Sequence, residues 1–160
     1  MLKGFITNLG KYNEGELIGE WIELPIDEDE LEAVFERIGI NEEYEEFFFT
    51  DWECDFETGL GEYETIEKVN ELAEALEDAD AEIIKAIIEA TGYSIEQALE
   101  MEDNVIFYAN TTLEDVAYDI IHDCYQLPEI VERYFDYEAF ARDLSYDGYY
   151  EVSNGTICIQ

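Results

Sequence analysis

The chain has 160 residues, and its 43 Asp and Glu against 7 Lys and Arg give it a formal net charge of -36. This charge opposes compaction and argues against direct nucleic-acid binding, which relies on Lys and Arg to neutralise phosphates. Hydrophobic residues still make up 48% of the chain and aromatics 14%, so the composition predicts a folded protein with a carboxylate coat rather than a disordered acidic chain.

The N-terminal segment, 1–61, is predicted to be a small α/β domain. Strands are expected at 2–9 and 16–24, joined by a Gly- and Asn-rich loop over 10–15. A helix follows, because Asp27 is a good N-cap and Gly39 a good stop signal. Its apolar residues recur at helical spacing: Leu31, Val34, Phe35 and Ile38.

The stretch from 40 to 57 interleaves aromatic and acidic residues and contains no Lys or Arg. A strand is predicted within 45–56, and strict alternation puts Phe49 and Trp52 on opposite sides of it. We expect the aromatics to face a core and the acids to face water. The acids are candidates for a partner-binding surface: Glu42, Glu43, Glu45, Glu46, Asp51, Glu53, Asp55 and Glu57.

The middle segment, 62–103, is predicted to be a largely helical domain. Thr65 and Asp80 are placed to open two amphipathic helices, and Gly92 to close the second. Ser94 and Gln97 have the spacing of a capping box for a short third helix.

The C-terminal segment, 104–160, returns to mixed structure and completes an α+β chain of three domains. A strand at 104–110 precedes a helix that opens at Thr112, and two short helices broken near Asp136 are expected in 127–144. Asn154-Gly155 predicts a two-residue hairpin turn. The three segments carry net charges of -15, -12 and -9, so the charge belongs to the whole body.

Enzymatic and metal chemistry find little support, and no catalytic residue, metal or cofactor is expected. No nucleophile elbow, zinc-protease, P-loop or dinucleotide motif is present. His122 is the only histidine and is interpreted as an ordinary helix residue. An EF-hand reading fails because Ile83 replaces the required Gly; its acids would be Asp78, Asp80, Glu82 and Glu89. The cysteines suit reduced thiols: Cys54, Cys124 and Cys158.

The remaining hypothesis is that the carboxylates imitate phosphates. Duplex DNA carries one charge per about 1.7 Å, so 36 charges match roughly 61 Å of duplex, or about 18 base pairs. A compact globule of this length would be only about 39 Å across. Matching the charge density of DNA therefore favours an elongated body. No apolar run is long enough for a membrane span or a signal peptide, so the chain is expected to be cytoplasmic.

Three stretches resemble the ArdA antirestriction family: NLGKYNEGELIGEW (8–21), EEFFFTDWE (45–53) and YFDYEAFARDL (134–144). The resemblance implies a DNA mimic encoded by a mobile element such as a conjugative transposon or plasmid. It would bind both the methyltransferase core and the full complex of a Type I restriction-modification enzyme and occupy the DNA-binding groove. Binding would block restriction and often modification. It further implies an elongated, curved array of three small domains, and a homodimer.

By the same resemblance, residues 127–144 correspond to an antirestriction motif. Its candidate functional acids are Glu129, Glu132, Asp136, Glu138 and Asp143. Its aromatic residues are candidates for packing or dimerisation: Tyr134, Phe135, Tyr137 and Phe140. A structural role and direct partner contact both stay open for this motif. The alternative functions are an acidic inhibitor or chaperone of another basic DNA-binding protein, and an adaptation to high salt.

Overall fold

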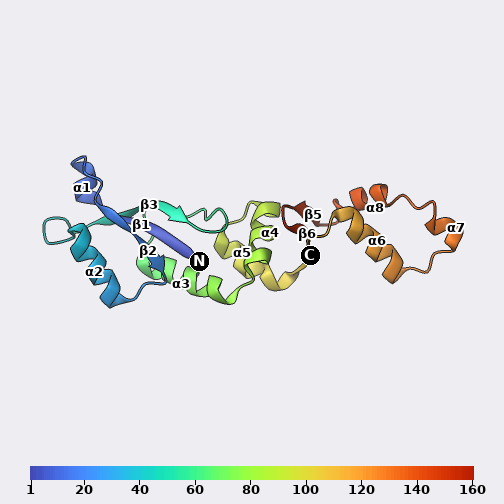
Figure 1. The fold of residues 1–160 in the computed structure, drawn as a ribbon, viewed down its shortest axis with the longest axis horizontal. Helices are drawn as coiled ribbons and strands as arrows, with labels where there is room; N and C mark the ends of the chain where they lie inside the picture. The colour runs from blue at the N-terminus through green and yellow to red at the C-terminus, as the bar shows by residue number, and fades with distance from the viewer. The chain divides into compact units, whose positions relative to one another are not determined.

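The computed structural model describes all 160 residues and divides them into two compact units, 1–79 and 80–160 (Figure 1). The first unit carries 25 acidic against 4 basic residues, a net charge of -21, and the second 18 against 3, a net charge of -15. Both units contain helices and a small sheet, which confirms the α+β class. The division into three domains and the elongated arrangement stay predictions.

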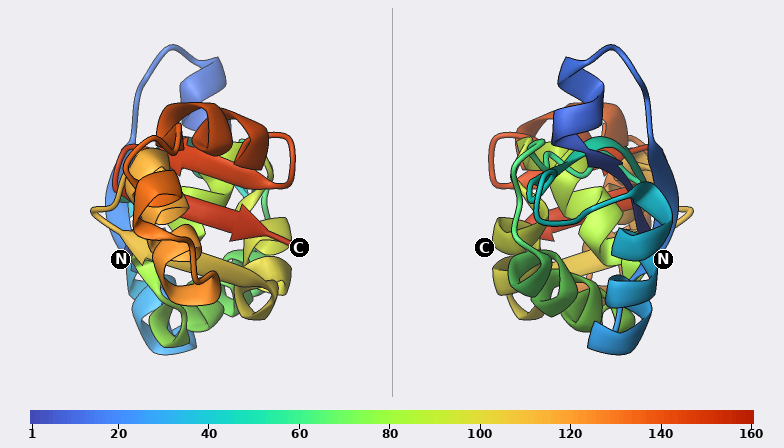
Figure 2. Two further views of the ribbon diagram at one scale, coloured as in Figure 1. Left: turned by 90° about the vertical axis from the view of Figure 1, so that its right-hand side faces the viewer. Right: turned by 90° about the vertical axis from the view of Figure 1, so that its left-hand side faces the viewer.

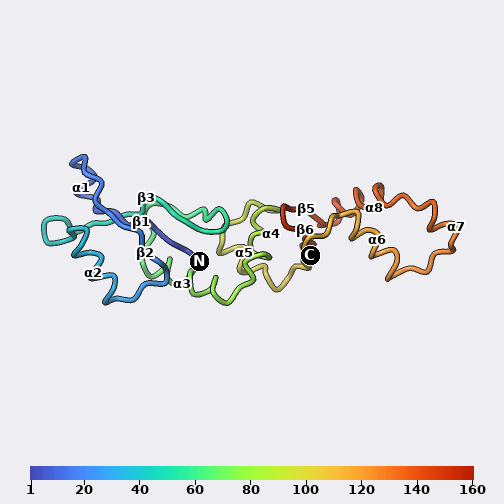
Figure 3. Tube along the Cα trace, in the orientation of Figure 1, coloured from blue at the N-terminus to red at the C-terminus, as the bar shows by residue number.

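The N-terminal unit is built on a three-stranded antiparallel sheet of order β2-β1-β3. Its core contains aliphatic residues from the sheet and the helices together with Phe49, which is fully buried. Its elements, which can be followed along the chain trace (Figure 3), are β1 (Leu2–Asn8), α1 (Leu9–Asn13), β2 (Gly19–Leu24), α2 (Glu28–Ile38), β3 (Phe47–Glu53) and α3 (Ile66–Asp78).

A bulge in β3 changes which of its side chains share a face. Phe5 pairs with Asp51 while the next residue, Ile6, pairs with Phe49, so Thr50 is an extra residue in the ladder. The extra residue reverses the alternation, and the rings of Phe49 and Trp52 lie in contact with centroids 4.3 Å apart. The prediction that these two residues face opposite sides was therefore wrong.

Gly4 makes room for this aromatic pair. A Cβ at this position would lie 2.8 Å from atoms of both the Phe49 and the Trp52 rings. A side chain there would displace the rings, so the absence of one is what allows them to pack over β1.

The segment 10–15, predicted to be a loop, contains most of a short helix. Helix α1 spans Leu9–Asn13, and the Asn8 side chain caps it by accepting a hydrogen bond from the Lys11 amide at 2.9 Å. Gly15, at φ 89°, occupies the left-handed region just beyond the helix. The loop prediction was wrong because Asn8, the last residue of β1, also acts as an N-cap and starts a helix directly after the strand.

The C-terminal unit contains a second antiparallel sheet, of order β4-β6-β5. Helix α4 packs against β5 and β6, and α6 packs against α8; the two red strands lie side by side in Figure 2. The elements are α4 (Ala81–Thr91), α5 (Ile95–Met101), a 3-10 turn (Glu102–Asn104), β4 (Val105–Ala109), α6 (Leu113–Cys124), α7 (Glu129–Glu132), α8 (Tyr137–Leu144), β5 (Tyr149–Val152) and β6 (Gly155–Ile159).

The C-terminal hairpin is present, but its turn lies one residue earlier than predicted. Val152 pairs with Gly155, so the two turn residues are Ser153 and Asn154. Gly155 begins β6 at φ 152°, and a Cβ there would collide with the carbonyl oxygen of Tyr108. Glycine is required at position 155 because the backbone of β4 lies too close for a side chain, and not because the turn needs it.

The helix-capping predictions are confirmed. The side chain of each predicted N-cap accepts a backbone hydrogen bond from the first turn, and Ser94 and Gln97 form a reciprocal capping box. Gly39 and Gly92 end their helices in the left-handed conformation. The predicted N-caps are Asp27, Thr65, Asp80 and Thr112. Asp136, near which only a break between two helices was predicted, caps α8 in the same way. No helix is both long enough and apolar enough to cross a membrane.

Candidate partner-binding site

All eight acidic residues singled out between 40 and 57 are exposed. Four of them lie in the turn between α2 and β3, residues 40–46, which we call the acidic loop, and none of the four forms an ion pair: Glu42, Glu43, Glu45 and Glu46. Further along, Glu53 pairs with Lys3 at 3.3 Å and Asp55 lies 3.8 Å from the N-terminal amine. The acidic loop is thus the part of this stretch whose charge is least compensated.

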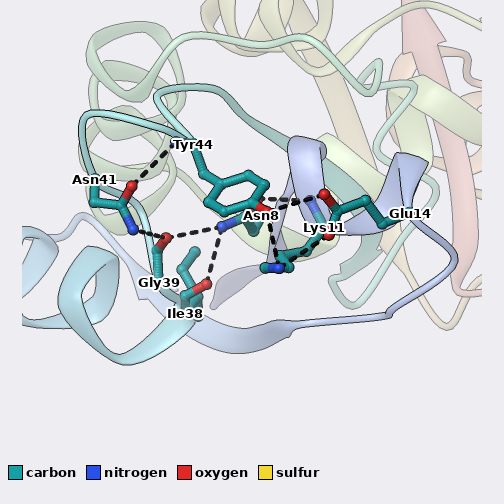
Figure 4. Close-up of polar contacts among 7 residues, drawn as sticks. All are labelled: Asn8, Lys11, Glu14, Ile38, Gly39, Asn41 and Tyr44. Atoms are coloured by element: carbon teal, nitrogen blue, oxygen red, sulfur yellow. Dashed lines mark hydrogen bonds and ion pairs between the residues drawn. The ribbon is translucent and has the colours of Figure 1, made fainter.

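Asn41 gives the acidic loop its shape. Its Oδ1 accepts a hydrogen bond from the amide of Glu43 at 2.8 Å. The same oxygen accepts from the amide of Tyr44 at 3.2 Å, and Nδ2 donates to the carbonyl oxygen of Gly39 at 3.1 Å (Figure 4). Asn is suited to such a turn because its side chain can replace backbone hydrogen-bonding partners. The carboxylates therefore project from a defined turn.

Tyr44 fixes the acidic loop to α1. Its hydroxyl donates to Glu14 Oε1 at 2.9 Å and accepts from Lys11 Nζ at 3.0 Å, while Lys11 Nζ also pairs with Glu14 Oε2 at 2.9 Å (Figure 4). The Lys11 ammonium lies 4.3 Å from the centre of the Tyr44 ring. The hydrogen bond to Tyr44 and the pairing with Glu14 raise the pKa of Lys11. The hydrogen bonds from Lys11 and Tyr44 lower the pKa of Glu14.

Gly10 completes this contact. A Cβ at Gly10 would collide with the Tyr44 ring, so the ring can lie against α1 only because position 10 lacks a side chain. This explains one glycine of the stretch 8–21 by a contact made 34 residues away rather than by a turn.

Asn8 links the same helix to the end of α2. Its side chain is fully buried, accepts from the Lys11 amide, and donates to the carbonyl oxygens of Ile38 and Gly39, both at 3.1 Å (Figure 4). Buried amides are costly unless satisfied, and this one has partners for both its oxygen and its nitrogen. Asn8 thereby sets the position from which the acidic loop departs.

Sequence reasoning missed these supporting residues. Asn8, Lys11, Glu14 and Tyr44 carry no helical or strand periodicity that marks them as a group. Their contacts join positions about 30 residues apart. The one available signal was that all but Tyr44 fall in the stretch 8–21, which had been interpreted as strands and a turn.

The acids of the C-terminal motif, residues 127–144, are less free than those of the acidic loop. Glu129 pairs with Arg133 at 3.3 Å, Glu132 Oε1 lies 3.5 Å from His122 Nδ1, and Asp136 caps α8 through the amide of Ala139. The two exposed acids of α8 form no ion pair: Glu138 and Asp143. Three of the five candidate acids therefore have a local structural partner.

Three of the four aromatic residues assigned to packing or dimerisation pack within the chain. The Phe135 ring lies 4.9 Å from Tyr137 and 5.9 Å from Phe140, and Tyr137 lies 5.2 Å from Tyr118 on α6, all between centroids. Tyr134 is 78% exposed and makes no ring contact. The motif is thus partly a structural element that closes α8 over α6.

The Tyr137 hydroxyl is the unsatisfied polar group of this cluster. It is buried and has no hydrogen-bond partner. Desolvation, with Glu132 and Tyr118 nearby, raises its pKa. The hydroxyl stays neutral, so the charge of the motif comes from its carboxylates.

The two candidate sets belong to different units: the acidic loop to 1–79 and the C-terminal motif to 80–160. Neither set, nor any other group of His, Cys, Asp and Glu side chains, has a geometry that could hold a metal ion. Two residues of the rejected EF-hand pattern have other roles: Asp80 caps α4, and Glu89 accepts hydrogen bonds from the amide and the hydroxyl of Ser153.

Comparison with known proteins identifies a family. A family model described as antirestriction protein (ArdA) matches residues 5–158, nearly the whole chain. No curated protein matches the chain.

Proposed function

This chain belongs to the ArdA family of antirestriction proteins, and from that premise we propose that it is an acidic mimic of DNA. It would occupy the DNA-binding groove of a Type I restriction-modification enzyme, block restriction of incoming mobile DNA, and block modification as well. The observation that carries the proposal is the acidic loop, four exposed carboxylates without ion pairs on a turn held at both ends.

Rigid presentation supports mimicry over a diffuse acidic coat. DNA offers phosphates on a stiff backbone, so a competitor gains by presenting its charges without a large loss of side-chain and backbone freedom on binding. Asn8, Asn41 and Tyr44 provide such a frame for the loop. The frame is a property that adaptation to high salt would not require.

The mechanism follows from electrostatics. A DNA-binding groove lined with Lys and Arg has a positive potential, which steers an acidic body into it and releases counterions on contact. Carboxylates present no base edges, so nothing in the contact depends on a recognition sequence. The protein should therefore inhibit enzymes of different sequence specificity alike.

The C-terminal motif enters the proposal in two parts. Glu138 and Asp143, exposed and unpaired, are proposed to face the partner. Asp136 and the ring cluster around Tyr137 are proposed to hold the motif in shape. The exposed Tyr134 is the motif residue best placed for a second copy of the chain.

The experiment is a competition titration. Purified protein is added to a Type I methyltransferase core bound to labelled duplex, at several salt concentrations and with two cores of different recognition sequence. We expect stoichiometric displacement for both cores. The affinity should fall steeply between 50 and 200 mM salt, by about 10³-fold if six or more charge contacts form.

The controls separate the alternatives. Replacing Glu42, Glu43, Glu45 and Glu46 together by Gln should weaken displacement by about tenfold at low salt, since each screened contact contributes a few tenths of a kcal/mol. Displacement of one core only would contradict backbone mimicry. Displacement of neither, with tight binding to an unrelated basic DNA-binding protein, would favour the alternative acidic inhibitor or chaperone.

A further inference from the structure

The N-terminal unit contains a groove that the acidic surface does not account for. It has a volume of about 740 Å³ and lies between α2, the start of β3 and the residues that lead into α3. Its apolar lining comes from four separate parts of the chain: Ile26, Leu31, Phe35, Phe47, Tyr63 and Ile66. Tyr63 is 71% exposed at its edge, so the groove is open to a partner.

Most polar groups of the groove are already engaged. The Asn70 side chain accepts from the Ile26 amide at 2.9 Å and donates to the Ile26 carbonyl at 2.8 Å. Thr65 caps α3 through the Lys68 amide, and Glu64 pairs with Lys68 at 2.8 Å. Asn70, Thr65 and Glu64 therefore already have hydrogen-bond or ion-pair partners within the unit, and the apolar side chains of the lining have none.

Two carboxylates at the rim are left without a cation. Glu28 in the first turn of α2 and Glu67 in the first turn of α3 line the groove and form no ion pair. Phe47, which forms one wall, follows directly after Glu45 and Glu46 of the acidic loop. An occupant must therefore combine an apolar centre with positive charge on its flanks.

We infer that this groove receives one large apolar side chain carried between Lys or Arg residues on the DNA-binding surface of the restriction enzyme. The inference rests on the proposed function and adds to it a contact that phosphates cannot make. Buried apolar anchors in fitted pockets, surrounded by polar contacts, contribute much of the affinity of protein interfaces. The groove would give the inhibitor an advantage over DNA that added salt does not remove.

Two neutral substitutions test the groove without changing the charge of the protein. Tyr63→Ala removes one wall and Leu31→Gln makes the lining polar, while Leu17→Gln is the matched control at an exposed leucine outside the groove. Each is titrated against the duplex-bound methyltransferase core from 50 to 300 mM salt. Thermal unfolding of each variant confirms that it is folded.

We expect the two groove variants to bind about tenfold more weakly at every salt concentration, with an unchanged slope of log Kd against log salt, and the control to bind like the wild type. Groove variants that displace duplex as well as the wild type would overturn this inference and leave the proposed function intact. A wild type that displaces no duplex would overturn both.

A peptide probe tests the chemistry of the groove without the enzyme. The full chain, labelled at Ile and Leu methyl groups, is mixed with a peptide of four lysines around one tryptophan, and then with the same peptide carrying alanine. We expect the tryptophan peptide to shift the methyl signals of Ile26, Leu31 and Ile66, and the alanine peptide to leave them in place. Equal shifts with both peptides would show that only charge is recognised and would overturn the inference.

Discussion

At the residue scale, the acidic loop depends on side chains that are not acidic. Asn8 holds α1 to the end of α2, Tyr44 holds the loop to α1, and Gly10 leaves the space that the Tyr44 ring needs. Each of these contacts joins segments distant in the sequence. Together they determine the position of the loop that carries the carboxylates, not the number of charges.

Replacing Asn8 by alanine should destabilise the N-terminal unit. The change removes a helix cap and leaves the carbonyl oxygens of Ile38 and Gly39 without their donor in a buried site. The expected cost is about 2–3 kcal/mol in the free energy of unfolding, measured by urea denaturation. Asn13→Ala, at an exposed residue of the same helix, is the control. Equal stability of the two variants would contradict the role given to Asn8.

Tyr149 should limit stability at high pH. Desolvation, together with the neighbouring Cys158 and Tyr108, raises its pKa from 10.0 to about 12. A pKa raised on folding gives stability that is fully present below pH 10 and is lost as the pH rises through about 12. Circular dichroism of the wild type should therefore show unfolding across that range, and Tyr149→Phe should lessen the loss. Tyr146→Phe, at an exposed tyrosine, should leave the profile unchanged.

At the element scale, the helices of this chain begin and end where short-range signals put them. The caps at Asp27, Thr65, Asp80 and Thr112 each involve a side chain and an amide two or three residues further on. Such contacts need no tertiary partner, so they can be found in the sequence. An acid that caps a helix has a structural role, whereas an exposed acid without a local hydrogen-bond or ion-pair partner is available to bind another protein.

Asp136 offers a direct test of that separation. Its Oδ1 accepts from the Ala139 amide at the start of α8, so Asp136→Asn keeps the cap and removes the charge, whereas Asp136→Ala removes both. We expect the Asn variant to be nearly as stable as the wild type and the Ala variant to lose about 1 kcal/mol. Both should weaken methyltransferase binding less than twofold, since a single exposed charge contributes a few tenths of a kcal/mol. A tenfold loss in the Asn variant would place Asp136 in the interface.

At the scale of the whole molecule, the chain folds against its own charge. The 7 Lys and Arg cannot neutralise 43 carboxylates, and the ion pairs that form are mostly exposed and contribute little. The opposing term is the burial of apolar side chains in each unit, including Ile6, Phe49, Ile84 and Ile157.

Salt should consequently stabilise the protein while it weakens partner binding. Raising NaCl from 0.02 to 0.5 M shortens the screening length from about 20 Å to about 4 Å and suppresses repulsion among the carboxylates. We expect the unfolding temperature to rise by at least 2–4 °C, the shift that about 1 kcal/mol gives for a chain of this size. The variant with four glutamines in the acidic loop should gain less. A fall in unfolding temperature would mean that ion pairs outweigh repulsion.

Two features of the fold could not be predicted from the sequence, for a common reason. The bulge at Thr50 and the turn at Ser153-Asn154 are each set by a neighbour distant in the chain: the register of β1 against β3, and the Tyr108 carbonyl beside Gly155. Helix α1 is different, because its cap from Asn8 to the Lys11 amide is local and was overlooked. Local patterns gave the right class of element nearby but not its register or its turn residues.

The sequence by itself determined the acidic character of the protein, the places where most helices start and stop, and the antirestriction family, because composition, capping and motif spacing are carried by residues close together in the chain. Only the tertiary structure decided that Tyr44 meets Lys11 and Glu14, that Asn8 reaches the end of α2, that Glu132 lies beside His122, and that residues from α2, β3 and α3 line one groove. These contacts depend on packing between segments 30 or more residues apart or between separate helices. The pattern of side chains within one segment does not specify which distant segment will pack against it.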